Sequence, residues 1–193
     1  MQRLLTLFAC CALSAISLSA QSATPLQDSP EAAIHRFLRL ASGGDLQTPK
    51  GWEQANLLFV HPTPMPEAKS TIIMGEDYTV REVWTRGSHA QVVVTYRNLG
   101  TIDSSLHYSA PDPRISKVEQ RYQLIRAGAP IGAEVKGGET SGALGWRIQN
   151  PHAVFFIGPI AASQYLSLMS ESANSPMLKR NADAALQRLK TLH

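Results

Sequence analysis

The sequence predicts an α+β domain. Apolar residues recur with a helical period up to about residue 60, with a period of two between residues 71 and 149, and with a helical period again after residue 151. β-Branched and aromatic residues are concentrated in the middle segment, which is typical of strands. Because the connections between most of these strands are short, we expect an antiparallel meander with helices before and after it.

The first 22 residues have the layout of a cleavable secretory signal peptide. Arg3 precedes an apolar stretch over residues 4–18, and small residues such as Ala20 follow. The stretch is shorter than the roughly 20 apolar residues that span a bilayer, so we expect no integral membrane segment after cleavage. The protein is therefore expected to be exported, to a periplasmic or extracellular space. A lipoprotein anchored at Cys10 is the alternative.

The cysteine positions and the net charge restrict which kinds of protein the mature domain can be. Both cysteines, Cys10 and Cys11, lie in the signal peptide, so the mature domain is expected to fold on its hydrophobic core without a disulfide. The chain has 18 Lys and Arg against 15 Asp and Glu, and loss of Arg3 with the signal peptide leaves a net charge of +2. A balance this even, with scattered basic residues, argues against a nucleic-acid-binding surface.

A hydroxyl residue followed by proline marks the start of three helices, because the hydroxyl caps free N–H groups and proline suits the first helical position. These pairs are Ser29–Pro30, Thr48–Pro49 and Ser175–Pro176. Apolar stripes at helical spacing predict four helices after a short lead-in over 23–29. They are expected over residues 30–42, from 48 to about 60, over 159–171, and from 176 onwards.

Alternating apolar residues predict five strands, and Arg86 to His89 form the turn of a hairpin. The clearest alternation places Val92, Val94 and Tyr96 on one face. Two longer connections, residues 99–116 and the glycine-rich residues 127–142, interrupt the sheet. The expected strands are 71–75, 78–86, 90–98, 117–126 and 143–149.

Two N-terminal helices, a proline-rich link, a curved meander and a last strand reading Gly145–Trp146–Arg147–Ile148 resemble the nuclear-transport-factor-2-like superfamily. That superfamily includes ketosteroid isomerases, scytalone dehydratase and polyketide-cyclase-like proteins. The resemblance covers residues 30–150, and the helices in 151–193 extend it. It implies a cone-shaped, cystatin-like roll in which a strongly bent antiparallel sheet wraps around helix 30–42 and leaves an apolar cavity. The superfold hosts enzymes, binding modules and scaffolds, so fold alone does not decide function.

The resemblance also implies an acid–base pair in the cavity for any enzymatic member. His35, with Glu31 one turn earlier, and Tyr96 or Tyr122 on apolar strand faces are the candidates for base and oxyanion donor. An exposed helix pair and packed core tyrosines account for the same residues. No local motif matches the isomerase residues.

Other patterns point to ordinary structure. Asp103, Ser104, Ser105 and His107 lie within five residues, a spacing typical of a solvated turn and not of a Ser-His-Asp site. Asp77 at a strand start is a turn former. The six histidines have no metal-ligand spacing, and the glycines match no phosphate or dinucleotide motif, so neither a metal nor a cofactor is expected.

We therefore expect a non-enzymatic exported domain that binds a small apolar molecule, or forms a homo-oligomer through its sheet face. The residues expected to line the pocket are Trp52, Tyr96, Tyr122 and Trp146. One alternative is a cofactor-free lyase or isomerase, which needs a titratable side chain buried in the cavity. A second alternative is an interaction subunit, which an exposed apolar stripe on the last helix favours.

Overall fold

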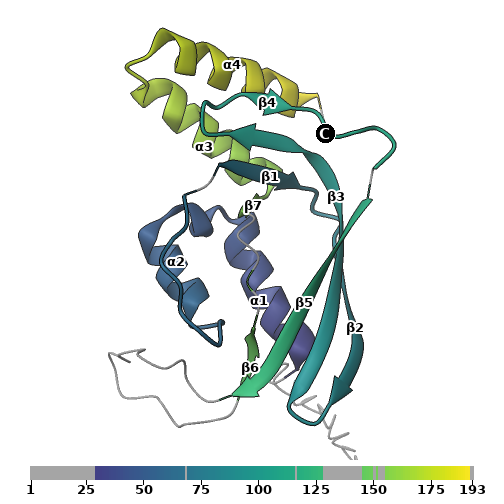
Figure 1. Cartoon of the computed structure of the whole chain (residues 1–193). Helices are drawn as coiled ribbons and strands as arrows, with labels where there is room; N and C mark the ends of the chain where they lie inside the picture. The colour runs from purple at the N-terminus through teal and green to yellow at the C-terminus, as the bar shows by residue number, and fades with distance from the viewer. Residues whose placement is uncertain are drawn as a thin grey trace, which may run out of the picture.

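The computed structural model describes residues 29–67, 69–115, 117–127, 145–149, 151 and 155–191. The predicted signal peptide with Cys10, nearly all of the predicted lead-in and nearly all of the glycine-rich connection lie outside these residues. The described part confirms the α+β class: four α-helices lie on the concave side and at one end of a strongly curved sheet (Figure 1). The helices are α1 (Pro30–Ser42), η2 (Asp45–Gln47, a 3-10 turn), α2 (Pro49–Asn56), α3 (Pro159–Ser172) and α4 (Pro176–Lys190). The strands are β1 (Ser70–Met74), β2 (Thr79–Arg86), β3 (His89–Asp103), β4 (Tyr108–Ser109), β5 (Lys117–Ala127), β6 (Gly145–Ile148) and β7 (Phe155–Ile157).

The helix starts follow the predicted caps. The Ser29 hydroxyl accepts a hydrogen bond from the Ala32 amide, and the Thr48 hydroxyl accepts one from the Gly51 amide. Ser175 occupies the corresponding position of α4, but its side chain makes no capping hydrogen bond. Local sequence therefore determines where the first two helices begin.

The end of α2 differs from the prediction. The helix stops at Asn56 because the following residues pair with β6: the Val60 amide donates to the Ile148 carbonyl at 2.9 Å, and the Ile148 amide donates to the Leu58 carbonyl at 2.7 Å. Backbone groups that bond to a strand are not available to continue a helix. The apolar residues after Asn56 therefore belong to a parallel β-bridge, in which Phe59 pairs with Ile148.

The sheet is built on β3, which is longer than the predicted strand 90–98. Its first half pairs with β2 and β5, and its second half pairs with β1 and β4. Residues 99–103 were predicted to begin a long connection, but they belong to this strand. They extend it because Leu99 and Ile102 are buried in a second core. Its two halves thus have different strand partners, and the sheet curves strongly along this strand (Figure 1).

The sheet is mixed, which corrects the prediction of a purely antiparallel meander. Strand β7, absent from the predicted elements, pairs parallel with β1 in the register Ile72 opposite Phe156. Its three residues are all buried and show no alternation. A run of three residues is too short to show a period of two, so its sequence does not indicate a strand. These residues form a strand because they pair with β1.

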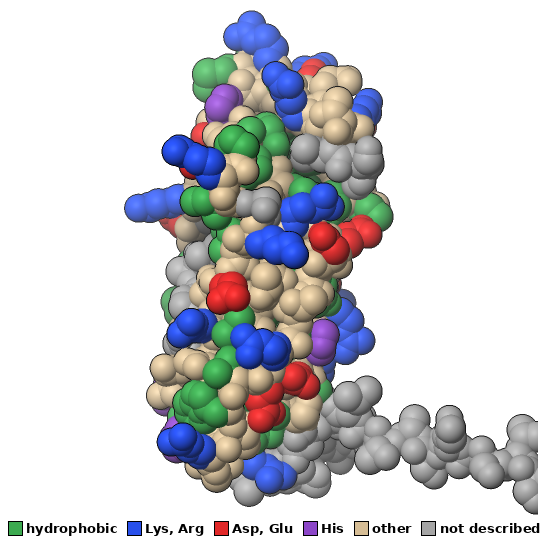
Figure 2. Space-filling model, turned by 90° about the vertical axis from the view of Figure 1, so that its right-hand side faces the viewer, with side chains coloured by type: hydrophobic (Ala, Val, Ile, Leu, Met, Phe, Trp, Pro, Cys, Tyr) green, Lys and Arg blue, Asp and Glu red, His purple; other side chains and the backbone are tan. Residues whose placement is uncertain are grey.

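Two cores hold the domain together. In the first, α1 lies in the concave face of the sheet and packs its apolar stripe against Val92, Val94, Tyr122 and Leu124. In the second, the α3–α4 hairpin covers the end of the sheet formed by β1, β4 and the last part of β3 (Figure 1). Figure 2 shows the side formed by β2, β3 and β5, where acidic and basic side chains are interspersed and hydrophobic ones are scattered.

Candidate functional site

The four residues predicted to line a ligand site all belong to the first core. The Trp52 ring lies 5.7 Å from the rings of Phe59 and Phe155, and its Nε1 donates to the Thr63 carbonyl at 2.8 Å. The other three are Tyr96, Tyr122 and Trp146. None of the four lines any of the pockets described below, and their role in ligand binding stays a prediction.

Both candidate oxyanion donors are buried phenols in aromatic surroundings. The Tyr96 ring lies 5.2 Å from Phe156, and the Tyr122 ring lies 6.0 Å from Phe37. Burial raises the pKa of Tyr96 to about 12. Burial, and to a smaller extent the nearby Tyr96, raises the pKa of Tyr122 still further. Both phenols therefore keep their protons at physiological pH, where they can donate hydrogen bonds but cannot act as bases.

The candidate base lies on the surface. His35 is exposed, with its ring 6.1 Å from that of Tyr78. Glu31 makes a different contact from the predicted helix pair: its Oε1 accepts a hydrogen bond from the Glu82 amide at 2.8 Å. That contact ties the start of α1 to strand β2. Asp77 forms an exposed ion pair with Arg97, with Oδ1 3.4 Å from Nε.

The cluster of Asp103, Ser105 and His107 is a hydrogen-bonded turn. Asp103 Oδ1 accepts from the Ser105 hydroxyl at 2.7 Å and from the amides of Ser105 and His107. The hydrogen bond from the Ser105 hydroxyl is the largest cause of the lowered pKa of Asp103. The serine hydroxyl thus donates to the carboxylate, so it is not arranged as a nucleophile beside a histidine base.

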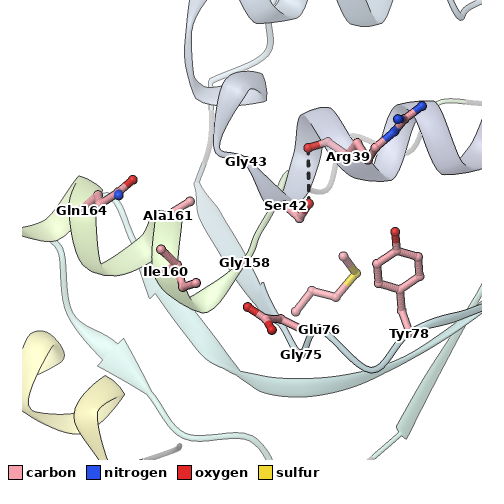
Figure 3. Close-up of a pocket in the computed structure, with 11 residues that line it drawn as sticks. Arg39, Ser42, Gly43, Gly75, Glu76, Tyr78, Gly158, Ile160, Ala161 and Gln164 are labelled. Atoms are coloured by element: carbon pink, nitrogen blue, oxygen red, sulfur yellow. Dashed lines mark hydrogen bonds between the residues drawn. The ribbon is translucent and has the colours of Figure 1, made fainter.

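A pocket of about 380 Å³ lies between the C-terminal end of α1, the link from β1 to β2, and the N-terminal end of α3 (Figure 3). We call it the α1–α3 pocket. Its surface is mainly apolar, with Met74 almost completely buried and Ile160 on α3 62% exposed. The described residues that line it are Arg39, Ser42, Gly43, Met74, Gly75, Glu76, Tyr78, Gly158, Ile160, Ala161 and Gln164.

Polar groups of different kinds surround this apolar surface. In Figure 3 the Tyr78 hydroxyl points toward α1, which carries Arg39, and the Glu76 carboxylate points toward the start of α3. Arg39 and Glu76 are both exposed, and neither forms an ion pair with another described residue. The pocket therefore offers a cation, an anion and a phenol around an apolar surface.

A second pocket, of about 440 Å³, continues along α3. It shares Gly43, Ala161 and Gln164 with the first and adds Leu168, which is largely exposed. Gln47 also lines it, and the Nε2 of this residue is buried without a hydrogen-bond partner among the described residues. An orphan donor of this kind is a place where a ligand atom can be bound.

Sequence reasoning missed these pockets. Their walls come from segments around residues 39–48, 74–78 and 157–168, and each segment taken alone is an ordinary helix end or strand link. The available sequence signal was the pair of apolar residues Ile160 and Leu168 on α3. The sequence of one helix does not show which of its faces other elements cover, so this signal could not locate a pocket.

Within the described ranges, no three His, Cys, Asp or Glu side chains are grouped so that they could hold a metal ion. The described helices include none with the length and hydrophobicity needed to cross a membrane. No family model, curated protein or solved structure matches this chain.

Proposed function

We propose that the protein is an exported, non-enzymatic binding module whose α1–α3 pocket takes a small, mainly apolar molecule. The observation that carries the proposal is the pocket itself: its volume lies in the range of small-molecule sites, and a few polar groups surround an apolar surface. Ile160 supports it further, because this large apolar side chain of the pocket lining is 62% exposed.

The position of the titratable groups favours binding over acid–base catalysis. Among the buried residues that the structure describes, none is Asp, Glu, His, Lys or Arg, and the buried hydroxyls are those of Ser170, Tyr96 and Tyr122. His35 and Glu76 face water, and the buried phenols of Tyr96 and Tyr122 lie in the first core, away from the described pockets. A general base is normally activated by burial beside its substrate, which supports a binding role for this pocket.

The resemblance to the nuclear-transport-factor-2-like superfamily remains part of the proposal. It is supported by the position of α1 in the concave face of a strongly curved sheet. The space between α1 and the sheet holds aromatic side chains such as Phe37, Phe59 and Tyr122. Because side chains occupy this space, we place the ligand in the α1–α3 pocket at the C-terminal end of α1.

The two interaction hypotheses have weaker support. The apolar stripe of α4, which includes Ala182, Ala185 and Leu189, is buried within the domain, so it is not available to a partner. On the sheet face, Trp84 is 38% exposed, and the guanidinium carbon of Arg86 lies 6.0 Å from its ring centre. Native mass spectrometry of the purified protein tests assembly directly, and a monomer would contradict a homo-oligomer.

Titration with the neutral fluorescent probe N-phenylnaphthylamine tests the pocket. We expect its fluorescence to rise on binding, and Ile160→Ala to weaken binding several-fold because the substitution removes apolar wall. Met177→Ala is the matched control, since Met177 is also an exposed apolar residue but lies on α4, outside the described pockets. Equal affinities for wild type and Ile160→Ala, or no binding, would overturn the proposed site.

A pocket-filling pair provides an independent check. Ala161→Phe places a ring where the two pockets join and should abolish probe binding, whereas Ala184→Phe adds the same ring to an exposed position of α4. Circular dichroism establishes that each variant is folded. Retained binding in a folded Ala161→Phe protein would also count against the proposal.

A further inference from the structure

The exposed face of α3 is unusual for a surface helix because it carries no charge. No charged residue precedes Glu171 in this helix, and Ile160 and Leu168 are 62% and 64% exposed. Helix α4, the other member of the hairpin, instead exposes charged side chains such as Lys179 and Arg180. A surface helix normally presents charged residues to water, so a charge-free face with large apolar residues is typical of a binding surface.

The two pockets described above join along this face. Ile160 lines the first pocket and Leu168 the second, while Ala161 and Gln164, both drawn in Figure 3, line the two together. With Tyr165, these residues follow a spacing of one, four, five and eight positions, which places them on one side of a helix. At about 1.5 Å per residue, Ile160 and Leu168 are about 12 Å apart along the helix. We call the combined space the α3 groove.

The other wall of the α3 groove is the segment that follows α1, and backbone contacts hold it against α3. The Gly158 amide, at the N-cap of α3, donates to the Ser42 carbonyl at 3.0 Å. Gly44 lies so close to α3 that a Cβ added to it would be 3.4 Å from the Cβ of Ala161. Both walls are therefore in position before a ligand arrives, which lowers the cost of ordering them on binding.

Charged side chains line only one end of the groove. Arg39 and Glu76 line the first pocket, together with Tyr78. The described residues that line the second pocket include none with a charged side chain. A molecule in the groove therefore meets a cation and an anion at one end and an uncharged surface toward Leu168. This distribution is complementary to an amphiphile whose head group has no net charge.

We propose that the α3 groove binds a single-chain amphiphile, with an alkyl or acyl chain lying along α3 and an uncharged or zwitterionic head group beside Arg39 and Glu76. The inference rests on the proposed function, because the head group occupies the α1–α3 pocket, and it adds the class of ligand. A compact molecule fits in one pocket and leaves the other open. A chain about 12 Å long covers both Ile160 and Leu168.

Methyl nuclear magnetic resonance tests the placement of the chain. Hexanol, octanol and decanol are titrated into the purified protein, and the methyl signals of Ile160 and Leu168 are followed. We expect decanol to shift both signals and hexanol to shift mainly that of Ile160. The affinity should rise at least about twofold for each added methylene, because each one buries more apolar surface. A Leu168 signal that decanol leaves unchanged, or an affinity independent of chain length, would overturn the inference.

The N-phenylnaphthylamine titration separates this inference from the proposed function. If the probe binds and Ile160→Ala weakens its binding, but decanol does not reach Leu168, the α1–α3 pocket stands and the single-chain ligand is wrong. If neither the probe nor any of the alcohols binds, both proposals are wrong.

A variant at the far end of the groove provides a second test. Leu168→Ala removes apolar wall there and should weaken decanol binding several-fold, with little effect on hexanol. Leu57→Ala is the matched control, since Leu57 is 48% exposed and lies outside the described pockets. Circular dichroism checks that both variants are folded. Equal decanol affinities in Leu168→Ala and the wild type would contradict the groove.

Two further ligands with the same chain length test the head group. Decanoate and decylamine bring a net charge to the end of the groove where Arg39 and Glu76 lie, so both should bind more weakly than decanol. Tighter binding of either would overturn the assignment of a head group without net charge. Native mass spectrometry tests the competing occupant, a second copy of this chain. A dimer that Leu168→Ala converts to a monomer would assign the face to that copy and overturn the proposal.

Discussion

The ring of Tyr108 lies directly over the α-carbon of Gly100. A Cβ atom at Gly100 would overlap the ring atoms of Tyr108, and the backbone at Gly100 has a φ of +138°. The Tyr108 hydroxyl donates to the Leu99 carbonyl at 2.7 Å, which holds the ring in this position. The contact joins β4 to β3 at the base of the second core.

Gly100→Ala should therefore destabilise the domain by at least about 2 kcal/mol, since it adds backbone strain to a steric overlap. Urea unfolding followed by circular dichroism measures the change. Gly145→Ala is the control, because a Cβ there meets no atom within 4 Å, and its midpoint should stay close to that of the wild type. Equal midpoints for the two variants would show that Tyr108 does not occupy this position.

Tyr96 should make the domain less stable at high pH. An unfolded tyrosine loses its proton near pH 10, whereas burial keeps folded Tyr96 protonated up to about pH 12. Between these values the folded state binds more protons than the unfolded state, so the free energy of unfolding falls as pH rises. Urea unfolding at a series of pH values should show this loss, with a shallower slope in Tyr96→Phe. An unchanged slope would exclude a raised pKa at this residue.

The contact between Ser170 and Asp183 should stabilise the α3–α4 hairpin. The Ser170 hydroxyl, on a side chain that is 8% exposed, donates to Asp183 Oδ1 at 2.7 Å. Because the acceptor is charged, Ser170→Ala should cost about 1.5 to 3 kcal/mol. Ser172→Ala on the same helix removes only exposed hydrogen bonds to the Leu168 and Met169 carbonyls and should cost less than about 0.5 kcal/mol. A double-mutant cycle with Asp183→Ala isolates the pair, and a coupling near zero would contradict it.

Phe37 should be the most costly residue of α1 to truncate. Its ring lies 5.8 Å from that of Phe59 and 6.0 Å from that of Tyr122, so it links α1 to the residues that follow α2 and to β5. Phe37→Ala should destabilise the domain by about 3 to 5 kcal/mol, the usual cost of removing a buried aromatic side chain. Leu57→Ala, at a position 48% exposed, serves as the control and should change the unfolding midpoint little. Similar losses in both variants would mean that α1 does not centre the first core.

Local signals predicted much of the secondary structure. The Ser29–Pro30 start and the Gly43 end place α1 at the predicted residues, because the capping groups and the apolar stripe all lie within that segment. The turn between Arg86 and His89 is also local, and Gly87 adopts the positive φ that such turns require. Each of these features depends only on residues a few positions apart.

Features that depend on distant partners were not predicted. Strand β7 exists because β1 lies beside it, and α2 ends early because β6 offers hydrogen bonds to residues 58–60. The two pockets show the same limit, because their walls come from segments far apart in the sequence. Trp52, Tyr96, Tyr122 and Trp146 belong to the first core, and their predicted role in ligand binding stays a prediction.

The sequence by itself determined the α+β class, the starts of the helices and the period-two strands, since these follow from side-chain periodicity and capping within short segments. Only the tertiary structure decided which of these surfaces are covered. It placed Arg39, Glu76 and Ile160 around one pocket, although these residues are far apart in the sequence. Periodicity shows that a face is apolar or charged, but what lies opposite that face depends on how the whole chain packs.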